Sequence, residues 1–283
     1  MRTIYPKLVN SSQLTPLFSL DASLQEIIWV LAPVVITLVS TQIGTAVGLL
    51  LVAVVLVGGG AWFILSPEVG RVRIPRSRSA LGKVVLKPPV LLATIIGFLL
   101  IGACSAVEVG VVATFEHGSL AAGLVLAVFA VGSLAGGLSF GHIPIGPWAM
   151  ARRLTIVTVG LALTMFSLNE FWLGGTLIVA GIGVAPALAV LFAITTASVK
   201  FSETAEAFGW AGTGQLIGAA AGSAVAGFLV DATDPRGAYL AATLFAAAGL
   251  VVSIVFVRSF PDLRHRDASP HPDTCLLYTS PSP

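Results

Sequence analysis

Eight long apolar runs limit what this chain can fold into. An open strand in lipid would leave backbone groups unpaired, so a run of this kind crosses a bilayer as a helix. All the runs except the fifth reach the ~20 residues that a helix needs to cross ~30 Å of hydrocarbon. We therefore predict an all-α, polytopic membrane protein with eight transmembrane helices, at residues 21–40, 43–65, 89–113, 119–140, 154–170, 172–196, 207–230 and 238–258.

The composition agrees with a surface that faces lipid. Of the 283 residues, 56% are hydrophobic and only 10% are charged. Soluble domains carry about 25% charged residues, so this chain cannot cover a globule with polar surface. Its two cysteines, Cys104 and Cys275, lie in an apolar run and in the tail, and they support neither a disulfide nor a metal site.

The segment 66–88, between the second and third apolar runs, is strongly basic. It holds six Lys and Arg residues against the single acid Glu68. Such a segment can be a nucleic-acid patch, a solvated linker or a cytoplasmic loop. The apolar spans on both sides favour the cytoplasmic loop, because Lys and Arg close to a span stay on the cytoplasmic side. We therefore expect no nucleic-acid partner.

Eight spans around a cytoplasmic loop place both chain termini in the cytoplasm. Of the fifteen Lys and Arg residues, only Arg236 then lies outside. A topology chosen at random would not sort the charges in this way. We expect a multi-pass protein of the plasma or inner membrane.

Small residues recur at helical spacing in two of the runs. Gly214, Gly218 and Gly222 form a stripe on the seventh run, and Gly132 and Gly136 form another on the fourth. Such stripes let helix backbones approach closely in lipid. The two runs correspond if the six helices after the basic segment repeat as three plus three, which is an arrangement that secondary transporters use.

Five polar side chains are candidates for a substrate or proton pathway. Glu108 lies about five residues, or ~7.5 Å, from the outer end of its span. It can serve proton coupling or cation recognition, or it can reach the outer headgroups. Gln25 and Glu26 lie near the inner end of the first span, where Glu26 is a buried proton or substrate group or pairs with a basic neighbour. Thr213 and Gln215 are expected to line a central path.

One proline interrupts the sixth run at its middle. Pro186 removes a backbone hydrogen bond and permits a kink, which acts as a gating bend or as a static feature. No catalytic signature of the Gly-x-Ser-x-Gly, phosphate-loop or His-Glu-x-x-His type occurs in the sequence. We expect no enzyme, and no metal or cofactor.

Residues 181–231 carry a family resemblance. They read GIGVAPALAVLFAITTASVKFSETAEAFGWAGTGQLIGAAAGSAVAGFLVD and are similar to the tenth and eleventh helices of bacterial efflux members of the major facilitator superfamily. More broadly, residues 89–258 resemble the C-terminal six-helix half of these transporters. The first two spans resemble the last two helices of the N-terminal half.

The resemblance implies that the chain holds the last eight of twelve helices. Residues 1–65 would be a remnant of the N-terminal half, 66–88 the loop between halves, 89–260 the C-terminal half and 261–283 a disordered or artefactual tail. It also implies export of a small hydrophobic or drug-like compound by proton-coupled alternating access. Its partners would be the lipid bilayer, the small-molecule substrate and protons. The alternative is a truncated, non-transporting membrane remnant or scaffold.

Overall fold

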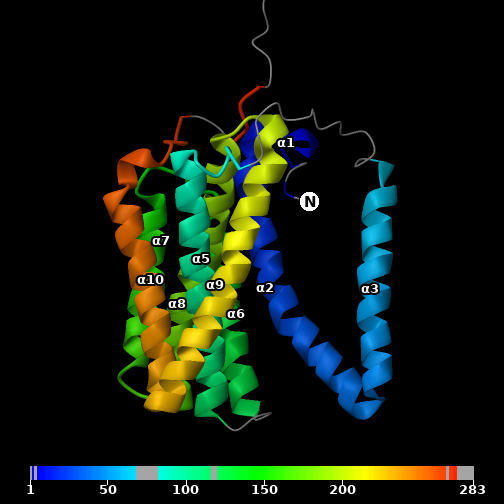
Figure 1. The fold of residues 1–283 in the computed structure, drawn as a ribbon, viewed down its shortest axis with the longest axis vertical. Coiled ribbons are helices and arrows are strands. Elements are labelled where there is room, and N and C mark those ends of the chain that lie inside the picture. Colours follow the sequence, from blue (N-terminus) through cyan, green and yellow to red (C-terminus); the bar gives the residue numbers. More distant parts are fainter. Residues whose placement is uncertain (1, 3–4, 68–81, 116–119, 266–267, 273–283) are drawn as a thin grey trace, which may run out of the picture.

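The structure, a computed structural model, describes residue 2 and residues 5–67, 82–115, 120–265 and 268–272. Within these ranges the chain is helical, and the predicted all-α class is confirmed (Figure 1). The elements are α1 (Tyr5–Leu8), α2 (Ser11–Gln42), α3 (Thr45–Leu65), α5 (Pro88–Thr114), α6 (Leu120–Phe140), α7 (Ala149–Thr164), α8 (Glu170–Ala197), η2 (Phe201–Glu203), α9 (Thr204–Ala232), α10 (Arg236–Val255) and η3 (Val257–Ser259).

Among the described residues, six helices are long and apolar enough to cross a membrane: α3, α5, α6, α8, α9 and α10. Two more, α2 with 32 residues and α7 with 16, run alongside them and complete the predicted eight. The fifth predicted span is shifted, because α7 covers 149–164 rather than 154–170. It ends before Asn169, whose side-chain oxygen accepts from Phe171 N at 3.0 Å and caps α8.

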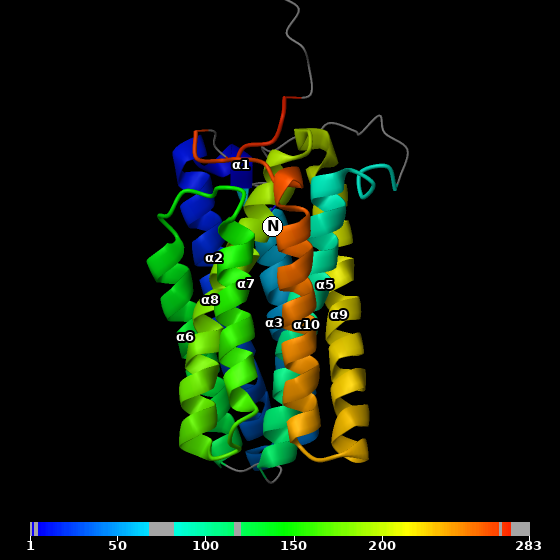
Figure 2. The ribbon, with the colours of Figure 1, turned by 90° about the vertical axis from the view of Figure 1, so that its left-hand side faces the viewer.

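The six helices α5 to α10 form one bundle with α8 at its centre. Helix α5 packs mainly against α9, and α6 packs mainly against α8. Helix α10 lies between α5 and α7, as Figure 2 shows. In a three-plus-three repeat α5 corresponds to α8, and α6 corresponds to α9. The contact between α5 and α9 then has its counterpart in the contact between α8 and α6. This is the packing that the predicted three-plus-three repeat requires.

The glycine stripe of α9 fits against the backbone of α5. A Cβ on Gly218 would overlap the carbonyl oxygen of Phe98, and one on Gly222 would overlap that of Gly102. A Cβ on Gly214 would meet Thr94 O at 2.8 Å. Helix α9 can approach α5 this closely only because these positions carry no side chain.

The corresponding stripe of α6 fits against α8. A Cβ on Gly132 would meet the backbone of Ile178, and one on Gly136 would overlap the carbonyl oxygen of Ile182. The next face of α6 contacts α2, where Ser19 Oγ donates to Gly137 O at 2.5 Å. Helix α6 therefore joins the part of the chain before the basic segment to the part after it.

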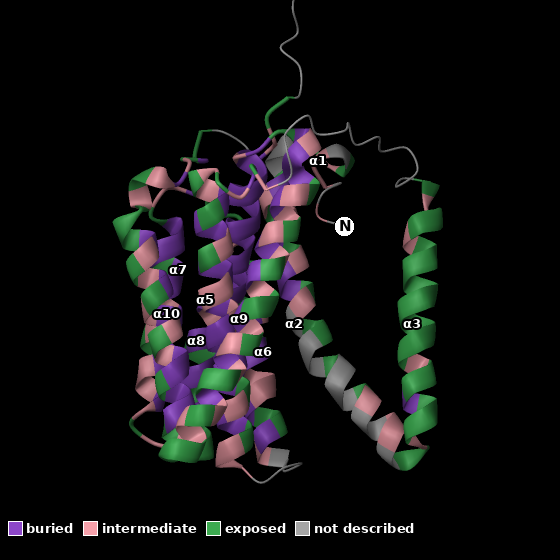
Figure 3. Cartoon of the chain, viewed as in Figure 1, coloured by how far each residue is buried: buried purple, intermediate pink, exposed green. Residues whose placement is uncertain are grey.

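Helix α3 stands apart from the bundle in Figure 1 and is linked to it through α2. The turn between the two helices is made at Gly44, whose φ of +142° lies in a region that L side chains rarely adopt. Figure 3 shows that α3 is exposed along almost its whole length, whereas α8 is largely buried. An apolar helix without packing partners on most of its surface faces lipid or further protein.

One end of the bundle, which we call the basic end, carries Arg2, Lys87, Arg152, Lys200 and Arg258 at helix ends that meet there. Arg236 lies at the opposite end, at the start of α10. The helices therefore bring together the charges that the sequence pattern assigned to one side.

The basic segment is anchored where it meets α5. Most of it, residues 68–81, lies outside the described residues. Its last part is tied to the start of α9: Lys87 Nζ lies 2.6 Å from Glu203 Oε2, and Gly82 N donates to Glu206 Oε1 at 2.7 Å. Helices α5 and α9 are thus held together at the basic end by charge as well as by the glycine stripe.

The chain after α10 stays packed further than expected. The sequence suggested a disordered or artefactual tail from residue 261, but Leu263 and Ala268 are buried. Leu263 N donates to Ile145 O at 2.9 Å, and His271 N donates to Val199 O at 2.8 Å. Through residue 272 the described part of this tail lies across the basic end, while 273–283 lie outside the described residues.

Candidate functional site

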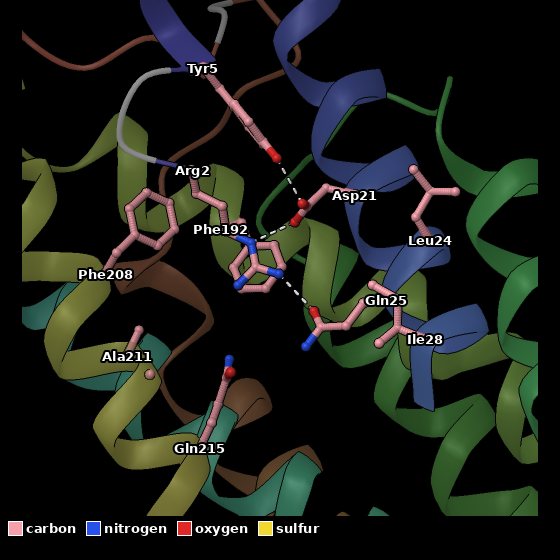
Figure 4. A pocket seen from close by; sticks show the side chains of 11 residues that line it. Arg2, Tyr5, Asp21, Leu24, Gln25, Ile28, Phe192, Phe208, Ala211 and Gln215 are labelled. Atoms are coloured by element: carbon pink, nitrogen blue, oxygen red, sulfur yellow. Dashed lines mark hydrogen bonds and ion pairs between the residues drawn. The ribbon is translucent and has the colours of Figure 1, made fainter. Parts of the chain in front are cut away.

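A pocket of about 580 Å³ lies between α2, α8 and α9 near the basic end. Figure 4 shows it from close by, with side chains from all three helices and from the N-terminal residues. Its walls combine an ionic cluster, an aromatic surface and two amides. The lining residues are Arg2, Tyr5, Asp21, Leu24, Gln25, Ile28, Phe192, Phe208, Ala211, Gly212 and Gln215.

The ionic cluster is built around Asp21 of α2. Arg2 Nε donates to Asp21 Oδ2 at 2.5 Å, and Tyr5 OH donates to Asp21 Oδ1 at 2.8 Å. Arg2 Nη2 also donates to Gln25 Oε1, one helical turn further along α2, at 2.7 Å. Burial, together with the hydrogen bond to this carboxylate, raises the pKa of Tyr5, so the phenol stays a donor at physiological pH.

An aromatic surface lies behind the ionic cluster. Phe192 of α8 and Phe208 of α9 have ring centroids 6.1 Å apart, and Phe18 of α2 lies 6.2 Å from Phe192. The guanidinium carbon of Arg2 sits 3.9 Å from the centroid of Phe192, within the range of a cation–π contact. The pocket therefore offers one carboxylate, one amide oxygen and a π-face within reach of a single guanidinium.

The pocket brings together two of the candidate residues. Gln25 reaches it from α2 and Gln215 from α9, where Gln215 Nε2 is buried and has no hydrogen-bond partner among the described atoms. A buried amide without a partner is costly, by about 1–3 kcal/mol, so this donor favours a ligand acceptor or a bound water. Thr213 is not part of the lining: it is exposed and donates to Gly209 O of its own helix at 2.9 Å. The side chain of Glu26 lies outside the described residues.

Glu108 lies far from this pocket along α5, but on nearly the same face of the helix as Gly97, which is close to the pocket. Eleven residues separate it from Gly97, which amounts to three helical turns with a drift of about 20° and ~16 Å of rise. A Cβ on Gly97 would contact Leu191 of α8 and Gln215 of α9, so this face of α5 looks toward the pocket side of the bundle. Glu108 is exposed on that face, about three turns further from the basic end than Gly97.

Helix α8 is weakened at Pro186, midway along its length. Pro186 has no N–H for the carbonyl of Ile182, and that carbonyl lies against Gly136 of α6. The preceding amide, Ala185 N, donates to Ser133 Oγ of α6 at 3.1 Å. A proline and an inserted hydroxyl at successive positions are recognised causes of helix bending. Both features lie at Pro186, and the gating kink stays a prediction.

Replacing Pro186 by alanine is expected to stiffen α8. The new N–H can donate to Ile182 O, which restores a backbone bond that the proline removes. Amide exchange across residues 182–190 should slow by about tenfold to a hundredfold, because local opening would cost about 1–3 kcal/mol more. Hydrogen–deuterium exchange of the purified protein measures this, with α10 as the internal reference. Unchanged exchange in α8 would show that the proline does not weaken the helix.

Nine of the eleven lining residues were not among the sequence-based candidates, and they include the five that form the ionic cluster and the aromatic surface: Arg2, Tyr5, Asp21, Phe192 and Phe208. Asp21 and Gln25 are spaced four residues apart, a spacing that places them on one helix face and could have pointed to a polar patch. The approach of Arg2 to α2 leaves no such signal, because it depends on how α1 folds back.

Two comparisons with known proteins bear on this fold. A family model described as Major Facilitator Superfamily matches residues 121–276, which is more than half of the 283 residues. A comparison with curated proteins finds none that matches the chain. The family match covers α6 to α10, five of the six helices of the bundle, including two of the three helices that line the pocket. With its membrane-length helices and this match, the chain belongs to the Major Facilitator Superfamily of membrane transporters.

Proposed function

We propose that this chain works as a secondary transporter that exports a small hydrophobic or drug-like compound by proton-coupled alternating access. The observation that carries the proposal is which helices line the pocket: one precedes the basic segment in the chain, and two follow it. Gln25 comes from α2, before the segment, and Gln215 from α9, after it. A site between two groups of helices is what alternating access needs, because rocking of the groups exposes it to either side.

The lining supports a mostly apolar substrate. Leu24, Ile28, Phe192 and Phe208 supply apolar walls, and a few polar groups can fix the orientation of a bound molecule. Small-molecule sites combine apolar and aromatic walls with a small number of placed polar groups. A sugar, with its many hydroxyls, would need more amides and charges than this pocket offers.

The direction of export rests on the charge pattern. Arg2, Lys87, Arg152, Lys200 and Arg258 share the basic end, which we place in the cytoplasm of a plasma or inner membrane. The pocket then lies near the cytoplasmic side, from which an exporter loads. The exposed surface of α3 and the open side of the pocket are where further helices would pack.

Everted membrane vesicles test the proposal. Vesicles that contain the protein and have an acidic interior should take up Hoechst 33342 against its gradient, since protons leaving would drive the dye in. Gln215→Leu should lower this uptake, because it replaces the amide in the pocket wall. Thr158→Val serves as the control, since Thr158 lies on α7 and bonds only to its own helix, at Leu154 O.

The alternative, a non-transporting remnant or scaffold, predicts a different result. Such a protein would show no uptake beyond that of empty vesicles at any pH gradient. Uptake that needs the protein but ignores the pH gradient would contradict proton coupling alone.

A further inference from the structure

We propose that the pocket binds a flat organic cation, an amidinium or guanidinium joined to an aromatic ring, in the place that Arg2 occupies. Arg2 is then a tethered competitor that the ligand must displace. The inference deepens the proposed export function by naming a substrate class, and it rests on that function only for the step in which the ligand is moved. Binding itself can be measured separately.

The hydrogen-bond acceptors around Arg2 match such a cation. The guanidinium uses two of its nitrogens, Nε toward Asp21 Oδ2 at 2.5 Å and Nη2 toward Gln25 Oε1 at 2.7 Å. Tyr5 OH donates to the other oxygen of Asp21 and holds the carboxylate in place. A planar cation with two N–H groups on one edge can make the same two bonds, which a spherical ammonium cannot do with equal geometry.

The aromatic surface completes the match. The face of the guanidinium lies over Phe192 at 3.9 Å, and Phe208 stands beside that ring at 6.1 Å. A cation over an aromatic ring gains about 0.5–2 kcal/mol, with the larger values at sites shielded from water. A ligand that joins its cation to an aromatic ring would stack on Phe192 and contact the tilted ring of Phe208 beside it.

Arg2 fills only part of the pocket. Its side chain keeps 26% of its surface exposed, and about 580 Å³ remains open beside it. Gln215 also lines this space, and its buried Nε2 is an unpaired donor that Arg2, itself a donor, cannot satisfy. Arg2 precedes α1 in the chain and lies outside the long helices.

Fluorescence binding with p-aminobenzamidine tests the proposal on the full-length protein in detergent. Its uncharged analogue p-aminobenzamide has nearly the same shape. In Arg2→Ala the dissociation constant of the amidine should fall about tenfold, if the tether leaves about a tenth of the molecules open. Arg264→Ala is the matched control. It removes an arginine from an exposed ion pair with Asp262, outside the pocket, and should change nothing.

Adding Asp21→Asn to Arg2→Ala should raise the dissociation constant about tenfold or more, since a hydrogen bond to a charged group is lost. A second measurement needs no substitution: saturating amidine should speed amide exchange in α1, because Arg2 is displaced, and the neutral amide should not.

Equal affinity in the wild type and Arg2→Ala, with α1 exchange unchanged, would mean that Arg2 and Asp21 form a structural latch. Equal affinity for amidine and amide would also overturn the proposal. Either failure leaves the export proposal standing, and binding without vesicle uptake would contradict export alone.

Discussion

Replacing Gly218 by alanine is expected to destabilise the bundle strongly, although alanine is the better helix former. On an open helix face the change would stabilise by about 1 kcal/mol. At Gly218 the new methyl group would overlap the carbonyl oxygen of Phe98, which belongs to the backbone of α5 and cannot move aside as a side chain could. The helices must then separate along their closest contact. We expect a net loss of at least about 3 kcal/mol, at the upper end of the effects of overpacking.

Gly227→Ala is the control for this experiment. Gly227 lies on the same helix nine residues further on, and a Cβ there would meet nothing within 4 Å. Thermal unfolding in detergent, followed by tryptophan fluorescence, should show a lower midpoint for Gly218→Ala and an equal or higher one for Gly227→Ala. Equal midpoints for the two variants would refute the close packing of α9 on α5.

The number and place of the helices could be predicted because hydropathy reports burial in lipid directly. The expected spans at 89–113 and 172–196 agree within two residues with α5 and α8. The prediction missed the first ten residues of α2, which begins at Ser11 rather than near residue 21. That part carries Ser, Gln and Thr around Leu14 and Phe18, the two apolar side chains that are buried there. A window average cannot detect a helix that is held by so few contacts.

The pocket could be predicted only in part. Gln25 and Gln215 stand out in the sequence because an amide within a span has no reason to face lipid. Phe192 and Phe208 do not stand out, because aromatic residues are ordinary in apolar helices. Arg2 was counted only as a charge near the terminus, and its place over Phe192 depends on a contact between residues 190 positions apart. Such contacts follow from tertiary packing and leave no local pattern.

Glu108→Gln is expected to abolish proton-driven uptake in everted vesicles while leaving substrate exchange intact. A charged side chain within a span costs about 2.5–3.5 kcal/mol, so an acid at such a position indicates a function. Glu108 is exposed on the face of α5 that looks toward the pocket side of the bundle, and no charged partner is found for it among the described residues. Glutamine keeps its shape and hydrogen bonding but cannot take up or release a proton. Uptake against a gradient should therefore fall to the level of empty vesicles.

The exchange of labelled for unlabelled dye across the same vesicles separates coupling from binding. This exchange needs the pocket and the movement of the helices but no net proton transfer, so Glu108→Gln should retain it. Glu108→Asp should recover part of the proton-driven uptake, because a carboxylate is present again at nearly the same depth. Glu170→Gln, at the exposed first turn of α8, removes an equal charge away from this face and should behave as the wild type.

Proton-driven uptake that survives Glu108→Gln would remove Glu108 from the mechanism. Loss of exchange as well would assign it a structural role, since a group that only carries protons is not needed to bind and release the dye.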